Sequence, residues 1–133
     1  MKVSLAHSLG GLAHLLQATA PAEALAHYGE SLRLGRAMES SRIIAHCLEG
    51  GALIDVARGN AAQAATLLGA ASAIRTRTGT ALEPDEKDEV DGTEGRCRDI
   101  LSGEEFTRAW QHGASLDADA AAEWALLRWE GNG

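Results

Sequence analysis

The chain has 133 residues, a formal net charge of −7 and a pI near 5.1. This length suffices for one domain with its own apolar core. No apolar run approaches the ~20 residues that are needed to cross a bilayer. The acidic charge opposes binding to the phosphate backbone of a nucleic acid. Apolar residues make up 45% of the chain, and Ala and Leu dominate among them, which favours close-packed helices. We therefore expect one all-α domain over residues 1–133 that binds neither membranes nor nucleic acid directly.

Apolar residues with a 3.6-residue period predict four helices in the first 79 residues. Pro21 suits the first turn of the second helix, and Ser40 and Ser41 can cap the third. Gly59 and Gly79 follow the third and fourth helices, since glycine readily takes the left-handed conformation that ends a helix. The expected helices span residues 3–18, residues 21–37, the segment between Ser40 and Gly59, and residues 61–76.

Three more helices are expected after Gly79. The acidic run from Glu83 to Asp91 begins a fifth helix that ends near Leu101, although Gly92 and Gly95 weaken it. A sixth helix spans residues 104–111, and a seventh spans residues 118–129 after a cap at Asp117. Large side chains on the last two helices should seal the end of an alanine-rich stack, and any that are exposed would become an interface; they are Phe106, Trp110, Trp124 and Trp129.

The first four predicted helices form two hairpins that resemble each other. Ala24-Leu25 aligns with Ala64-Ala65, a spacing of about 40 residues against ~34 in the standard tetratricopeptide repeat. Stacking buries the apolar face that each hairpin alone leaves bare. We therefore expect residues 1–79 to form two tetratricopeptide-like hairpins in a short right-handed solenoid, which residues 80–133 cap with about three helices.

A series of sequence segments, from the second hairpin onward, resembles a known protein family. They run Leu48-Glu49-Gly50-Gly51-Ala52-Leu53, Ala57-Arg58-Gly59-Asn60 and Ala64-Ala65-Thr66-Leu67-Leu68-Gly69-Ala70-Ala71, then Phe106-Thr107-Arg108-Ala109-Trp110 with Gly113. Over nearly its whole length the chain resembles the C-terminal tetratricopeptide region of large bacterial regulators, notably LuxR-type transcriptional regulators and related signalling ATPases.

This resemblance implies a regulatory module and not an enzyme. Proteins of the family carry an ATPase module and a helix-turn-helix DNA-binding domain on the same chain, whereas this sequence has no GxxxxGK[ST] phosphate-binding loop. The chain departs from the family pattern in a longer turn at residues 17–21 and in Gly92 and Gly95. The expected function is non-catalytic binding, without a cofactor, to a partner protein or to the missing upstream domains of a longer regulator.

Polar residues gather on the face of the hairpins that should be concave. Of these, His7, His14, His46 and Glu49 are the candidate groove for a partner segment, and imidazoles would make its charge change near neutral pH. Three alternatives stay open: an ordinary wet helix face, an adventitious metal site, and a site for a small-molecule effector. The whole predicted concave face comprises Ser4, His7, Gly11, His14, His46, Glu49, Leu53 and Val56.

A second candidate surface lies on the first predicted helix, whose leading face has no preceding repeat. Terminal units of a repeat array need a polar outer face, and this one is apolar. We expect self-association there, most simply as a homodimer with two-fold symmetry. The face comprises Val3, Leu5, Leu12 and Leu16.

The cysteines predict neither catalysis nor a metal site. Cys47 and Cys97 lack CxxC spacing, which favours a reducing, cytoplasmic setting. The N-terminal stretch resembles a signal peptide only superficially, because polar residues interrupt its apolar region. His46 and Cys47 point about 100° apart on a helix, and Cys97 would be activated only if its flanking arginines approached it. The acidic run fails the register of a calcium loop and suits a helix start.

Overall fold

The computed structural model describes the backbone of residues 2–131 and the side chains of residues 4–130. Within this part the chain is all-helical, as predicted, and no helix is long and apolar enough to cross a membrane. The seven helices are α1 (Lys2–Leu16), α2 (Pro21–Ala37), α3 (Ser41–Ala57), α4 (Ala61–Thr78), α5 (Pro84–Ile100), α6 (Gly103–Ala114) and α7 (Ala118–Gly131).

Short-range contacts at the predicted caps and stops define the helix ends. The hydroxyl of Ser40 accepts a hydrogen bond from the Ile43 amide at 3.3 Å, and the Asp117 carboxylate accepts one from the Ala120 amide at 2.7 Å. Gly79 follows α4 with a φ of 66°, which glycine adopts without a Cβ clash. These three predictions are confirmed.

Helix α5 matches its predicted extent, and α6 runs further than predicted. Helix α5 is continuous through both glycines, where Thr93 and Cys97 are buried, and a capping box between Glu83 and Glu86 and a proline at its start stabilise its first turn. Helix α6 runs to Ala114, beyond the predicted end at residue 111, because Gly113 packs directly against the backbone of α4.

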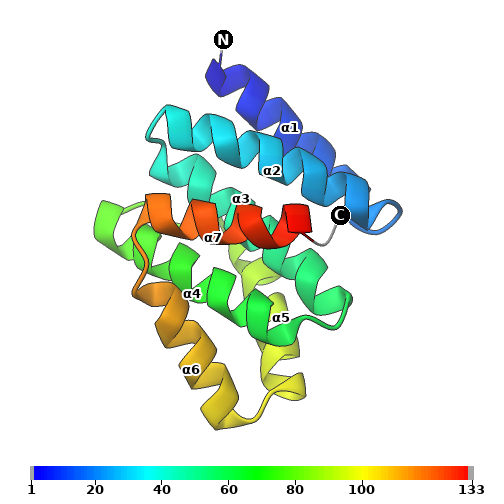
Figure 1. Cartoon of the computed structure of the whole chain (residues 1–133), viewed down its shortest axis with the longest axis vertical. Helices are drawn as coiled ribbons and strands as arrows, with labels where there is room; N and C mark the ends of the chain where they lie inside the picture. The colour runs from blue at the N-terminus through cyan, green and yellow to red at the C-terminus, as the bar shows by residue number, and fades with distance from the viewer. Residues whose placement is uncertain (1, 132–133) are drawn as a thin grey trace.

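The first four helices pack as neighbours in chain order: α1 lies along α2, α2 contacts α3, and α3 lies along α4 (Figure 1). Fully buried alanines, including Ala24 and Ala64, allow these helices to approach closely. Tyr28 fills the space left by Gly50, where a Cβ atom would overlap the phenol ring.

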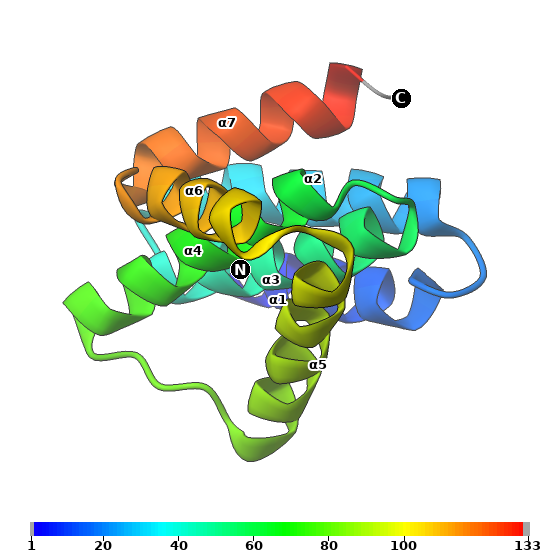
Figure 2. The ribbon, with the colours of Figure 1, turned by 90° about the horizontal axis from the view of Figure 1, so that it is seen from below.

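The last three helices lie on different sides of this group. Helix α6 packs along α4, and α7 crosses α2 and α3, where Trp129 occupies the space above Gly51. Figure 2 shows α7 on one face and α5 on the opposite face, against α3 and α4. This position of α5 creates the pocket described next.

Candidate binding groove

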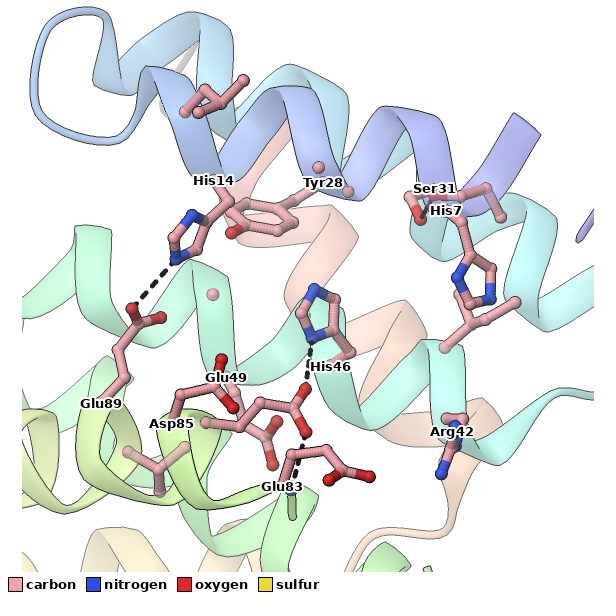
Figure 3. Close-up of a pocket in the computed structure, with 18 of the residues that line it drawn as sticks. His7, His14, Tyr28, Ser31, Arg42, His46, Glu49, Glu83, Asp85 and Glu89 are labelled. Atoms are coloured by element: carbon pink, nitrogen blue, oxygen red, sulfur yellow. Dashed lines mark hydrogen bonds and ion pairs between the residues drawn. The ribbon is translucent and has the colours of Figure 1, made fainter. Parts of the chain in front are cut away.

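A pocket of about 450 Å³ lies between α1, α3 and α5, with residues of α2 and α4 at its floor. His7, His14, His46 and Glu49, the four candidate groove residues, all line it. Figure 3 shows His14 of α1 and His46 of α3 facing carboxylates of α5 across this space, whereas His7 lies on the side of Arg42. The structure therefore brings together residues that lie up to 42 positions apart in the sequence, from His7 to Glu49.

Two histidine–carboxylate pairs join the groove to α5. Nε2 of His14 lies 3.0 Å from Oε2 of Glu89, and Nδ1 of His46 lies 3.4 Å from Oε2 of Glu86. Glu86 also accepts a hydrogen bond from the backbone amide of Glu83 at 2.9 Å, so one carboxylate both caps α5 and pairs with α3. All four side chains are between 32% and 50% exposed, which leaves both pairs screened by water.

Glu49 lines the groove but is already paired within the protein. Its two carboxylate oxygens accept hydrogen bonds from Nε and Nη2 of Arg75 at 2.7 and 2.9 Å, and both side chains are buried. Burial raises the pKa of Glu49, and the bonds from Arg75 oppose that rise. With both oxygens bonded to Arg75, Glu49 and Arg75 form part of the pocket floor as a paired unit.

The two hydroxyl side chains of the pocket lining are also held by the protein. Gln17 donates to the Tyr28 hydroxyl at 3.0 Å, and burial raises the pKa of Tyr28 to about 12, so this group stays a neutral phenol. Ser31 donates to the carbonyl oxygen of Ala6 at 2.8 Å. Neither hydroxyl has a general base as its hydrogen-bond acceptor.

Some residues of the predicted concave face lie elsewhere. Val56 is buried in the core, and neither Ser4 nor Leu53 lines the pocket. In their place α5 contributes a wall of carboxylates that sequence reasoning interpreted only as a solvated helix start. Glu86 and Glu89 are three residues apart on one face of that helix, and this spacing was the sequence signal for a second wall.

Comparison with protein-family models, with curated proteins and with solved structures gives no match for this chain. Evidence for its function therefore comes from the groove and the surfaces around it.

The cysteines and the acidic groups provide no reactive or metal-binding centre in the part of the chain that the structure describes. Cys47 and Cys97 are free and buried, and burial raises their pKa values to about 12 and about 11. The arginines beside Cys97 therefore do not activate it, because thiolates are the reactive form. Among the described residues, no group of three or more His, Cys, Asp or Glu side chains is arranged to hold a metal ion.

The outer face of α1 exposes apolar side chains. Leu5 is 52% exposed, Leu12 42% and Leu15 78%. Leu16 differs from the prediction because it is half-buried against the core, and the side chain of Val3 lies outside the described residues. We call Leu5 and Leu12 the outer face of α1, because Leu15 also lines the pocket.

Proposed function

We propose that the chain is a non-catalytic binding module, built from two tetratricopeptide-like hairpins in a short right-handed solenoid, whose groove binds a segment of a partner protein. One observation supports the proposal: three histidines that the sequence assigned to a ligand face, His7, His14 and His46, line a single pocket of about 450 Å³ with Glu49 in its floor. Binding sites combine such a cavity with a few convergent polar groups. The hydroxyls of Tyr28 and Ser31 are bonded within the protein, which favours recognition over nucleophilic chemistry.

We also propose that this module belongs to a cytoplasmic bacterial regulator of the LuxR type, with a separate protein or upstream domains as its partner. The residues that carry the family resemblance support it, because Gly69 and Gly113 are both required where α4 and α6 meet: a Cβ atom at either would overlap backbone atoms of the other helix. Two free cysteines and a net charge of −7 fit a reducing setting and a partner other than nucleic acid.

A homodimer through the outer face of α1 is part of the same proposal. Exposed leucines in a row on one helix favour association, and a two-fold arrangement lets the same surface serve both copies.

Fluorescence polarisation tests the groove with three labelled peptides of equal length, one acidic, one basic and one uncharged. At least one peptide should bind, and His7→Glu should change its affinity because His7 lines the pocket. The matched control is His112→Glu, which alters an exposed histidine on α6 outside the pocket. Binding that responds equally to both substitutions, or that is absent for all three peptides, contradicts the proposal.

A small-molecule effector site in the same groove is a second candidate. It is favoured by the enclosure of the pocket by α5 and by a volume within the ~300–1,000 Å³ range of ligand pockets. Thermal unfolding with free glutamate, arginine or inorganic phosphate as separate probes tests it, because a ligand that binds the native state raises the midpoint. A rise that His7→Glu removes would favour the effector site over the peptide groove.

A further inference from the structure

The two walls of the groove carry opposite charge types. Helices α1 and α3 contribute imidazole and guanidinium groups, whereas α5 contributes the carboxylates of Asp85, Glu86 and Glu89, and its N-cap Glu83 adds a fourth. Among the described residues, two basic side chains pair with that acidic wall, in His14–Glu89 and His46–Glu86. In the described part of the chain His7 and Arg42 form no hydrogen bond or ion pair, although both line the pocket. The wall on α1 and α3 therefore has unused capacity for carboxylates.

Helix α5 is attached unevenly along its length. Its second half is anchored by Cys97, which is fully buried, and by Leu101, which packs against the core just after the helix ends. In its first half, Val90 is the apolar side chain that packs against the core, and it is only half-buried. Among the described residues, the side-chain ion pairs from residues 84–91 to other helices are the two screened histidine pairs.

Two glycines separate the weakly held half from the anchored half. A Cβ atom at Gly92 or at Gly95 would meet nothing within 4 Å, so close packing does not require glycine at either position. Glycine is among the least favourable residues in a helix interior. Helix α5 thus has its weak point at Gly92, just before the buried Thr93 and Cys97, and the half that covers the groove can separate there while the other half stays in place.

We propose that residues 84–91 of α5 occupy, within the same chain, a groove that binds an acidic helical segment of a partner protein, and that the two compete for His14 and His46. This inference rests on the proposed function, since it names the chemistry of the partner for the same groove. The carboxylates of α5 indicate what the wall accepts, because electrostatic complementarity selects among partners. A partner segment that also reaches His7 and Arg42 gains contacts that α5 lacks, so it can displace α5.

The test uses a labelled peptide with the sequence of residues 83–95, added to the full chain. The double variant Glu86→Gln, Glu89→Gln removes both carboxylates from the cover, and glutamine can retain the capping box at position 86. It should bind the peptide at least about tenfold more tightly than wild type, because a covered groove lowers apparent affinity by its open fraction. The matched control is Asp88→Asn, Asp91→Asn, which makes the same charge change at exposed positions outside the pocket lining.

Adding His14→Gln and His46→Gln to the opened variant should abolish the gain. Equal binding by wild type, opened variant and control, or binding that survives loss of both histidines, overturns the inference. If a basic or uncharged peptide binds the groove and the acidic one does not, the proposed function stands and this inference fails. If no peptide binds any variant, both fail.

Hydrogen exchange on the wild-type chain gives a test that needs no variant. Excess acidic peptide should speed amide exchange in residues 84–91 and leave residues 97–100 unchanged, because only the covering half is released. Slower exchange throughout α5, as expected if the peptide merely adds to its outside, overturns the inference.

Discussion

The carboxylate of Asp55 connects three helices in the core. It lies on α3, is 2% exposed, and accepts hydrogen bonds from Gln63 of α4 at 2.9 Å and from the indole nitrogen of Trp129 of α7 at 3.3 Å. Buried polar groups of this kind are costly when they lose a partner. Asp55 therefore contributes to holding the last helix against the first hairpins.

Replacing Asp55 should destabilise the protein by an amount that depends on whether the new side chain can accept hydrogen bonds. Asp55→Ala leaves two buried donors without an acceptor and should lower the free energy of unfolding by about 1–3 kcal/mol, whereas Asp55→Asn keeps an oxygen and should cost less. Urea denaturation of both variants measures the difference. Equal losses would mean that packing, and not the hydrogen bonds, decides the effect.

The pH dependence of stability should also report on Asp55. Burial raises the pKa of its carboxyl group, while the bonds from Gln63 and Trp129 oppose the rise. The native state thus keeps a proton that the unfolded chain releases above about pH 3.9, so the contribution of Asp55 to stability falls as the pH rises from there toward the raised pKa.

Because an amide has no proton to release, Asp55→Asn should lose less stability than wild type as the pH is raised from about 4. Unfolding free energies at a series of pH values measure both slopes. Asp99→Asn, at an exposed position of α5, is the control and should keep the wild-type slope. Identical slopes for wild type and Asp55→Asn would contradict the prediction.

At the scale of helices, glycines have opposite roles in α5 and α6. Gly92 faces open space, whereas a Cβ atom at Gly113 would overlap the carbonyl oxygen of Thr66 on α4. We expect Gly92→Ala to stabilise the protein by about 1 kcal/mol through helix propensity. Gly113→Ala should destabilise it by about 1–3 kcal/mol, since α4 and α6 must separate. Thermal unfolding of the two variants should give shifts of opposite sign.

Helix crossings within the hairpins predict a second contrast. Ala64 is fully buried, and Leu5 is 52% exposed on the outer face of α1. Ala64→Leu adds volume where neighbouring helices touch and should cost about 1–3 kcal/mol or more, whereas Leu5→Ala should change stability by only about 0.5 kcal/mol. Thermal midpoints test the order, and an unchanged midpoint for Ala64→Leu would show that the site has room for a larger side chain.

For the whole molecule, the distribution of helices leaves the two candidate surfaces on separate parts of the fold. Helix α5 covers the groove, α7 covers α2 on the opposite side, and the outer face of α1 has neither above it (Figures 1 and 2). Self-association through α1 and partner binding in the groove can therefore be tested independently.

The oligomeric state should depend on the outer face of α1. Light scattering at tens of micromolar protein should give a dimer for wild type, and the double variant Leu5→Glu, Leu12→Glu should shift it to monomer, because burying two carboxylates in an apolar interface is costly. Leu127→Glu changes a leucine of α7 that is 64% exposed and serves as the control. A monomeric wild type, or a dimer that depends on Leu127, would contradict the proposal.

Local residues in the sequence determined where the helices lie. Ser40, Asp117 and Gly79 were each predicted to begin or end a helix and do so, because caps act between residues only a few positions apart. Apolar periodicity likewise identified the all-α class and put three histidines and Glu49 on faces that meet in one pocket. These properties need no knowledge of how distant helices pack.

Only the tertiary structure decided what faces the groove. His14 meets Glu89 although 75 residues separate them, and Trp129 meets Asp55 across 74. Arg75, which occupies both oxygens of Glu49, was not singled out in the sequence. Periodicity fixes the direction of a side chain about its own helix axis but not the helix that will lie opposite. That choice depends on side-chain volumes and close approaches such as Gly51 to Trp129, which arise only when the whole chain packs.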